Sequence, residues 1–450
     1  MELQQVKIDR SPLSSNRVRV SGIVTYDQRH LAPEEYWFDL DERYGADLLN
    51  SGDAWLVNLL PLATSQSEPL RLSLPVDPVL LQNLRRVARI WQCWDPRKLA
   101  VPIEAPTQQS GESSGSGTVA FFTGGVDSFF SILRHAAPSA GVRITELLYI
   151  WGYDIQLHQA EAFQRRLDRL ARAAGQLGLP LMDVATNSRA LRWGEDFMFA
   201  HGCGLAGIAH ALSRRYRQAI IASTGGYRDL DPGGSHVLTD PLLSSSRVRI
   251  LHDGAEYSRL EKTAHIAAVP LVQQTLHVCQ WYGDRNCGEC RKCYLTALTF
   301  DLFGHRPSIE TFPQRKGPPP DFTSKKQPAE SEKLTSLDWA ELHGAARLQQ
   351  REDIVREAER YFRQQRLAAR LLPIIRWLNR HPGGVRAVKW ASHNTIIRAA
   401  FRQLSNMEVW EPGELGQLLA RCRSAAAPTM TAGELASPAE VLEEEQVLVG

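Results

Sequence analysis

The sequence predicts an α/β protein built around a doubly wound parallel sheet. Between residues 118 and 313, short apolar segments such as TVAFFT alternate with amphipathic segments such as DSFFSILRHA. This alternation is typical of right-handed βαβ units, which form parallel sheets with helices on both faces. Two motifs in this part of the chain, a glycine-rich loop and a cluster of four cysteines, predict a ligand site and a metal site. Ligands of such sheets bind beyond the carboxyl ends of the strands.

Length and composition indicate a globular protein of two to four domains. The chain has 450 residues, of which 43% are hydrophobic and 23% charged, so wholly disordered and fibrous chains are excluded. Its 52 basic and 50 acidic side chains leave a net charge of +2, which gives the molecule as a whole no positive excess for nucleic acid. The first residues lack the pattern of a signal peptide, and no segment approaches the roughly 18 apolar residues of a membrane span. We therefore expect a cytoplasmic protein with no membrane contact.

Two polar segments divide the chain. The first is rich in Gly, Ser and Gln and the second in Pro, Lys and Glu, as is typical of linkers. The end of the chain is rich in Ala, Pro, Thr and Glu and is expected to be disordered. The predicted division is a β-rich N-terminal domain (1–106), a linker (107–117), the α/β domain (118–313), a second linker (314–333), a basic helical region (334–424) and a tail (425–450).

The N-terminal segment is predicted to consist mainly of strands. Short apolar or alternating runs between turn residues predict strands at RVRVSGIV, YWFDL, AWLVNLLPL and LRLSLP. Apolar residues at helical spacing predict one helix from Pro78 to Trp91. The segment carries no chemical motif, so we expect a docking or oligomerisation module, and with it a homo-oligomer.

The C-terminal region carries a row of positive charge. Between Tyr361 and Met407 there are nine Arg and Lys residues and no Asp or Glu. Arg363, Arg366 and Arg370 recur at helical spacing and share one helix face. Such a row indicates either a solvated face, paired with acidic groups of the preceding helix, or a surface that binds a nucleic-acid or protein acceptor.

The glycine loop is the sharpest signal in the sequence. The run FFTGGVDS (Phe121–Ser128) follows a strand and opens a helix. Adjacent glycines allow main-chain N–H groups to approach an anion, and the helix N-terminus adds a positive dipole end. Thr123 and Ser128 supply hydroxyls, and Asp127 supplies a carboxylate that would meet phosphate through Mg²⁺. The alternative is an ordinary tight turn in which Asp and Ser cap the helix. Neither a Walker loop nor a dinucleotide fingerprint is present.

The cysteine cluster predicts a structural metal. Cys279, Cys287, Cys290 and Cys293 lie within fifteen residues, and glycines between them let the chain turn. Four thiolates suit tetrahedral Zn²⁺, and a complete shell leaves no open position for catalysis. An iron–sulfur cluster and free cysteines remain as alternatives.

The glycine loop resembles the SGGxDS motif of the PP-loop ATP pyrophosphatases, with Thr in place of the first Ser. That family has a Rossmann-like sheet of the HUP type and cleaves ATP between the α- and β-phosphates. The resemblance implies that ATP pyrophosphate and Mg²⁺ bind at the loop, with Asp127 and Ser128 in catalytic roles. The implied ATP-binding residues are Phe122, Thr123, Gly124, Gly125, Val126, Asp127 and Ser128.

The loop and the cysteines together resemble the 7-cyano-7-deazaguanine synthase family. Members adenylate 7-carboxy-7-deazaguanine, and ammonia converts the adenylate to an amide and then, after a second activation, to a nitrile. The aromatic–Gly pair and H-x-x-E that follow the family's second strand are matched by Trp151, His158 and Glu161, which implies substrate binding. Lys262 lies where that family begins a helix with Lys, and the resemblance implies a catalytic contact with phosphate; a solvated lysine is the alternative.

The resemblance covers residues 117–304 and is not complete. The deazaguanine-binding run Tyr-Pro-Asp-Cys-Arg-Pro of that family is missing from residues 224–243. Activation of an acid is therefore better supported than the identity of the acid. Asp229, Asp253 and Glu256 follow predicted strands and are candidate substrate ligands, with a simple turn and helix cap as the alternative for Asp253 and Glu256.

These features predict an ATP-dependent C–N ligase. It would adenylate a deazapurine-like carboxylic acid, release pyrophosphate, and form an amide, nitrile or conjugate with ammonia or an amine. A PP-loop enzyme that modifies tRNA, guided by the basic helices, is an alternative. A non-catalytic nucleotide-binding or assembly module is an alternative of a different class.

Overall fold

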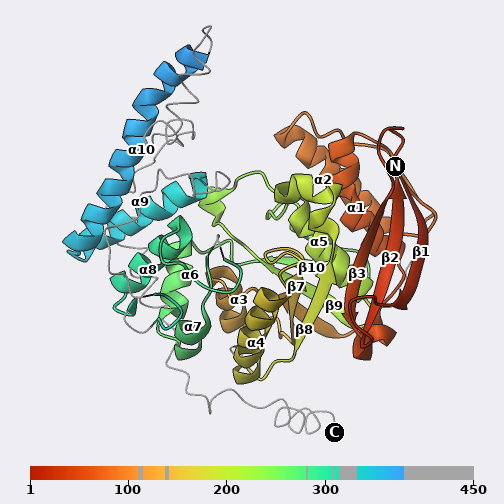
Figure 1. Cartoon of the computed structure of the whole chain (residues 1–450), viewed down its shortest axis with the longest axis horizontal. Helices are drawn as coiled ribbons and strands as arrows, with labels where there is room; N and C mark the ends of the chain where they lie inside the picture. The colour runs from red at the N-terminus through yellow and green to blue at the C-terminus, as the bar shows by residue number, and fades with distance from the viewer. Residues whose placement is uncertain (110–114, 137–140, 280–281, 307–308, 314–331, 380–450) are drawn as a thin grey trace.

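The computed structural model describes residues 1–109, 115–136, 141–279, 282–306, 309–313 and 332–379. Within them the strands form one ten-stranded mixed sheet in the order β10-β9-β6-β7-β8-β3-β2-β1-β4-β5 (Figure 1). The strands are β1 (Glu2–Arg10), β2 (Arg17–Thr25), β3 (Glu34–Asp41), β4 (Leu70–Leu72), β5 (Ile103–Glu104), β6 (Gly117–Phe121), β7 (Glu146–Trp151), β8 (Leu181–Thr186), β9 (Tyr216–Ala222) and β10 (Arg249–Asp253).

Helices α1 to α8 of the described part pack on both faces of this sheet, and α9 and α10 pack on α6 and α8. They are α1 (Gly52–Gln66), α2 (Pro78–Trp94), α3 (Val126–His135), α4 (Ala160–Gln176), α5 (Phe197–Ala211), α6 (Arg259–Ala267), α7 (Pro270–Thr275), α8 (Arg291–Leu302), α9 (Glu332–Leu348) and α10 (Glu352–Asn379). None of the described helices is long and apolar enough to cross a membrane.

The parallel half of the sheet has the doubly wound order that the sequence predicts. Counted along the chain from β6, the five strands β10-β9-β6-β7-β8 lie in the order 5-4-1-2-3, and all four pairings are parallel. The order reverses between β6 and β9. At such a switch point the following loops diverge to opposite sides, which leaves room for a ligand at the carboxyl ends of the two strands.

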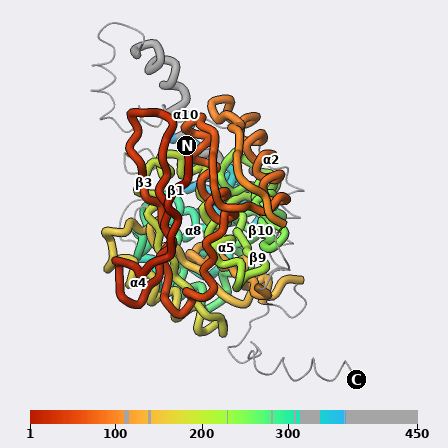
Figure 2. The backbone as a smooth tube through the Cα atoms, turned by 90° about the vertical axis from the view of Figure 1, so that its right-hand side faces the viewer, coloured from red at the N-terminus to blue at the C-terminus, as the bar shows by residue number. Residues whose placement is uncertain are grey.

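The N-terminal strands continue this sheet. β3 pairs antiparallel with β8 in the register Leu40↔Val184, and β2 and β1 follow antiparallel. The N-terminal strands lie at one end of the molecule in Figure 1 and face the viewer in Figure 2. Segments on both sides of the predicted linker at residues 107–117 therefore share one sheet.

Strand residues alternate between two apolar cores. On β6, Val119 and Phe121 face the core built with α1, α2 and α5, whereas Ala120, and Phe122 directly after the strand, face the core built with α3, α4, α7 and α8. This is the period of two expected of a strand buried on both faces.

One strand prediction is wrong. The run AWLVNLLPL, expected as a strand, lies inside α1, where all residues from Gly52 to Thr64 are buried. A helix that is covered on all sides shows no apolar stripe, so periodicity does not distinguish it from a buried strand. The helix predicted at residues 78–91 is confirmed as α2, which Asp77 caps through the N–H groups of Val79 and Leu80.

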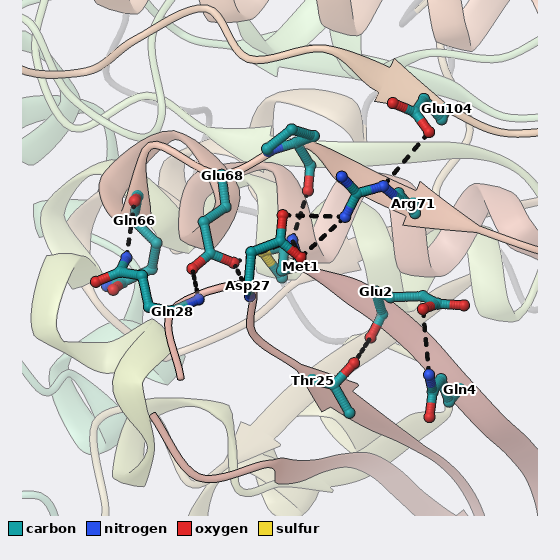
Figure 3. Close-up of polar contacts among 11 residues, drawn as sticks. Met1, Glu2, Gln4, Thr25, Asp27, Gln28, Gln66, Glu68, Arg71 and Glu104 are labelled. Atoms are coloured by element: carbon teal, nitrogen blue, oxygen red, sulfur yellow. Dashed lines mark hydrogen bonds and ion pairs between the residues drawn. The ribbon is translucent and has the colours of Figure 1, made fainter. Parts of the chain in front are cut away.

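An ion network closes the far edge of the sheet (Figure 3). The ammonium group of Met1 lies 3.0 Å from a carboxylate oxygen of Glu68 and 3.3 Å from one of Asp27. Arg71 of β4 bonds to Asp27 at 2.9 Å and contacts Glu104 of β5 at 3.4 Å. The network therefore ties the short strands β4 and β5 to the start of β1.

A helical hairpin covers α6 and α8. Trp339 of α9 is fully buried and stacks on Tyr361 of α10 at 4.8 Å. The hairpin shares one apolar cluster with Leu260 of α6 and with Leu295 and Leu298 of α8. Beyond that contact α10 projects away from the sheet (Figure 1). Residues 380–424 of the predicted basic helical region (334–424) and the tail 425–450 lie outside the described residues.

The close packing of α1 on α5 leads to a first prediction. A Cβ atom at Gly207 of α5 would lie 3.1 Å from the carbonyl oxygen of Ala54 and 3.2 Å from Cβ of Asn58, whereas one at Gly175 of α4 meets no atom within 4 Å. Gly207→Leu should destabilise the fold by about 1–3 kcal/mol, because the added side chain forces the helices apart. Gly175→Leu is the matched control and should leave the melting temperature unchanged or higher. Equal melting temperatures for the two variants would contradict this packing.

Candidate functional site

The glycine loop joins β6 to α3 at the switch point of the sheet. Gly124 has φ +66°, in the left-handed region that glycine adopts without steric cost, and Gly125 is extended. Gly125 is the N-cap of α3, and no side chain caps the helix. The Ser128 hydroxyl instead donates to the Gly125 carbonyl oxygen at 3.2 Å. The capped turn that the sequence left as the alternative is not formed, so the N–H groups at this helix end keep their capacity for an anion.

Neighbouring segments hold the loop in this conformation. The N–H of His277 donates to the Gly124 carbonyl oxygen at 2.9 Å. Nη2 of Arg166, on α4, donates to the carbonyl oxygen of Thr123. A Cβ at Gly124 would lie 2.8 Å from Leu170, so a glycine is needed there for space as well as for its φ angle.

Asp127 lies between two cations of α6. Nη1 of Arg259 is 3.1 Å from Oδ2 of Asp127, and Nζ of Lys262 is 3.7 Å from Oδ1. Lys262 also donates to the carbonyl oxygen of Ser223, which follows β9, at 2.5 Å. Its side chain is 1% exposed, so the alternative of a solvated lysine is wrong. Lys262 thus links the loops that follow β6 and β9.

Two further cations belong to the site: Lys292, whose charge interacts with that of Asp127, and Arg166, which bonds to the loop at Thr123. Burial lowers the pKa of Lys262, and burial together with the nearby charge of Arg259 lowers the pKa of Lys292 at the start of α8. Burial also lowers the pKa of Arg166 to about 10. Burial is the largest cause of all three lowered pKa values, and nearby acidic groups, which include Asp127 for the two lysines, offset it only in part.

The four cysteines come together as predicted. Their sulfur atoms all lie within 4.8 Å of one another, and the sulfurs of Cys287 and Cys293 are 3.9 Å apart. Tetrahedral Zn–S bonds of about 2.3 Å place sulfur atoms about 3.8 Å apart, whereas a disulfide needs about 2.05 Å. Cys290 and Cys293 are buried, and Cys279 and Cys287 are half-buried. The cluster therefore fits a structural metal such as zinc.

The cysteine cluster also positions the loop and a cation. Asn286 accepts from the N–H of Val278 at 2.9 Å and donates to the Leu276 carbonyl oxygen at 2.8 Å, which closes the turn between the first two cysteines. Cys290 is the N-cap of α8, two residues before Lys292. His277 lies two residues before Cys279, so one structural unit holds both the glycine loop and the start of α8.

The substrate candidates at the end of β7 and after it are Trp151, His158 and Glu161, and the contacts of Trp151 and Glu161 do not involve Asp127. Trp151 stacks on Phe163 at 4.6 Å, and its Nε1 donates to the Gln156 carbonyl oxygen. His158 is exposed, and the side chain of Glu161 is 94% exposed, 3.7 Å from Arg165.

The later candidates are tied to α3. Nε2 of His135 lies 2.9 Å from Asp253. Burial acts to raise the pKa of Asp253, but the pKa is lowered because the carboxylate accepts a hydrogen bond from His135. Arg134 pairs with Glu256 at 2.6 Å. The side chain of Asp229 lies outside the described part.

Sequence reasoning missed the cations that accompany Asp127. Arg259 lies one helical turn before Lys262, and this i, i+3 spacing is a signal that could have found it. Lys292 lies between Cys290 and Cys293, and no sequence signal connects it with Asp127. Arg166 belongs to no motif, and nothing local distinguishes it from the other arginines of α4.

Three acidic groups of the C-terminal hairpin pair with residues outside the basic row. Asp353 pairs with Arg351, Glu357 with Arg360, and Glu359 with His343 and Arg347. The two arginines of the row whose side chains the structure describes, Arg363 and Arg366, are exposed. The side chains of Arg370 and of the later members lie outside the described residues.

Comparison of the chain with protein-family models, with curated proteins and with solved structures gives no significant match in any of the three. The fold and the site therefore define an α/β protein with a four-cysteine cluster and a cation-rich loop at the switch point of its sheet.

The cysteine geometry leads to a second prediction. Cys290→Ser should lower both the bound zinc and the melting temperature, because metal binding and local folding are one equilibrium. Cys93→Ser, at an exposed cysteine outside the cluster, is the matched control and should change neither. Elemental analysis of the purified proteins measures the metal. Iron in the wild type, or full zinc in the Cys290 variant, would overturn the assignment.

Proposed function

We propose that this protein is an ATP-dependent C–N ligase that adenylates a carboxylic acid and transfers the acyl group to a nitrogen nucleophile. One observation carries the proposal: an uncapped glycine loop at the switch point places Asp127 among cations from α6 and α8. The resemblance of TGGVDS to the PP-loop motif supports ATP as the ligand. The resemblance of the cysteine spacing to the 7-cyano-7-deazaguanine synthase family supports a deazapurine-like acid.

The unsatisfied atoms of the site fit a triphosphate and its metal. Oδ1 of Asp127 is buried and has no hydrogen-bond partner, which suits a carboxylate oxygen that takes Mg²⁺. Nε and Nη1 of Arg166 are likewise buried without a hydrogen-bond partner, beside the loop that this side chain holds. Phosphate oxygens would satisfy such donors and neutralise the excess charge.

The side chains and main-chain groups of the site would each have a separate role in the reaction. Arg259 and Lys262 would exchange Asp127 for phosphate oxygens, which frees the carboxylate for Mg²⁺. Bound Mg²⁺ would neutralise charge on the phosphates as pyrophosphate leaves. The α3 N-terminus and the hydroxyls of Thr123 and Ser128 would hold the phosphates in line, so that the carboxylate of the substrate attacks the α-phosphorus. The zinc would hold the fold and take no part in the chemistry.

Replacement of the carboxylate gives a third prediction. Asp127→Asn keeps the size of the side chain but removes its charge, and it should slow ATP-dependent pyrophosphate release by about 10²–10³-fold, or about 3–4 kcal/mol. Asp9→Asn, at an exposed residue of β1, should have no effect. The assay measures pyrophosphate with ATP, Mg²⁺ and 7-carboxy-7-deazaguanine. A wild-type rate in the Asp127 variant would refute the proposed site.

The same assay distinguishes the non-catalytic class. Binding of ATP without release of pyrophosphate, across a panel of purine-like and deazapurine-like acids, would identify a nucleotide-binding module. The turnover assay thus decides between the two classes before any substrate is known.

A polyanionic acceptor is a second element of the proposal. Its basis is the exposure of Arg363 and Arg366, whose neighbouring acids pair with other residues. In a fourth prediction, the full-length protein should bind tRNA at low salt, and binding should weaken steeply as salt rises. The double variant Arg363→Glu/Arg366→Glu should reduce this binding, and Arg43→Glu, at an exposed arginine of the N-terminal segment, should not. No binding at low salt would dispose of this role.

A further inference from the structure

A second polar cluster lies at the same edge of the sheet, on the opposite face from α3. Asp240, the first residue of the short 3₁₀ turn Asp240–Leu243, is fully buried. Its Oδ2 accepts from Nδ1 of His252 at 2.7 Å and from the hydroxyl of Ser235 at 2.7 Å, and its Oδ1 accepts from the N–H of His236 at 3.1 Å. The carboxylate is thus held rigidly by three donors.

This contact determines which ring nitrogen of His252 carries hydrogen. A carboxylate only accepts, so Nδ1 must be the donor, and Nε2 of the neutral ring keeps its lone pair. No second partner of the His252 ring is present among the described residues. The same arrangement, in which a buried carboxylate orients an imidazole, prepares histidines to act as general bases.

The sheet register places His252 near the glycine loop. His252 pairs with Ile221 of β9, and Ile220 of β9 pairs with Ala120 of β6. His252 is therefore level with Phe121, the last residue of β6, at two strand spacings or roughly 10 Å. A substrate that contacts both the glycine loop and His252 would have to span this distance.

A second histidine, His236, lies close enough to His252 for their charges to interact. Burial lowers the pKa of His236, and a positive charge on His252 lowers it further, while Asp240 and Asp231 act in the opposite sense. His236 also lies against the Trp94 ring, with ring centres 4.7 Å apart. The Asp240 carboxylate lies directly against Nδ1 of His252, where it would stabilise a proton gained by the ring.

We infer that His252 is the general base that deprotonates the nitrogen nucleophile in the second half of the reaction, with Asp240 as its positioning residue. The inference rests on the proposed function. One proton of the attacking ammonium passes to Nε2 of His252, and the freed nitrogen pair forms the C–N bond to the acyl adenylate. The C–O bond to the phosphate breaks, AMP leaves with that electron pair, and the second proton lost by nitrogen passes to solvent.

The test compares two nucleophiles. Ammonium must lose a proton before it attacks, whereas hydroxylamine is largely unprotonated at neutral pH and traps acyl adenylates as hydroxamates. The reactions contain ATP, Mg²⁺, 7-carboxy-7-deazaguanine and either ammonium chloride or hydroxylamine. His252→Asn is the informative variant, because the Asn amide can still donate to Asp240 from near the position of Nδ1 but provides no base.

We expect His252→Asn to lower amide formation from ammonium by about 10²–10³-fold and to leave hydroxamate formation and pyrophosphate release unchanged. His252→Gln removes the base with a different geometry and should give the same split, and His30→Asn, at an exposed histidine, should change nothing. An equal fall with both nucleophiles, or no fall with either, would overturn the role of His252 while the ligase stands. A wild type that forms no hydroxamate would overturn the proposed function and this inference together.

Discussion

The contact of Asp127 with Arg259 and Lys262 is the interaction on which the rest of the site depends. Asp127 makes the short contacts with these buried cations, Asp253 and Asp338 add negative charge nearby, and the surrounding elements keep the cations away from water. α3 packs on α6 from one side, and α8 and α9 cover it from the other through Leu260 and Trp339. The C-terminal hairpin therefore contributes to the electrostatics of the site although its own exposed charges lie elsewhere.

The N-terminal part has a comparable indirect role. Through the pairing of β3 with β8 it extends the sheet, and α1 and α2 then cover the face on which α5 and the Asp240 cluster lie. Trp94, the last residue of α2, reaches His236. The glycine loop and the histidine cluster thus occupy opposite faces of one edge, each supported by a different part of the chain.

The elements that could be predicted from the sequence are those with a local signal. The alternation of strands and helices from β6 to β10, the glycine loop and the cysteine spacing each depend on residues close together in the chain. The pairing of Leu40 with Val184 has no such signal, because it joins two ordinary apolar strands far apart in sequence. α1 was misread for a physical reason, since complete burial removes its polar face. Arg166 and the Asp240–His252 contact likewise arise only from tertiary packing.

The hydrogen bond from the His277 N–H to Gly124 has a thermodynamic consequence. His277 is two residues from Cys279, so the main chain that leads into the cysteine cluster also fixes the conformation of the glycine loop. If the loop binds an anion as proposed, the two binding equilibria share one segment and are linked reciprocally. Any factor by which metal raises the affinity of the loop for the anion is then the factor by which the anion raises the affinity of the thiolates for metal. A structural metal at this place would therefore change the affinity of the loop for the anion without contacting the anion. Removing the metal with a chelator and displacing the anion with a competitor would both measure the same coupling free energy.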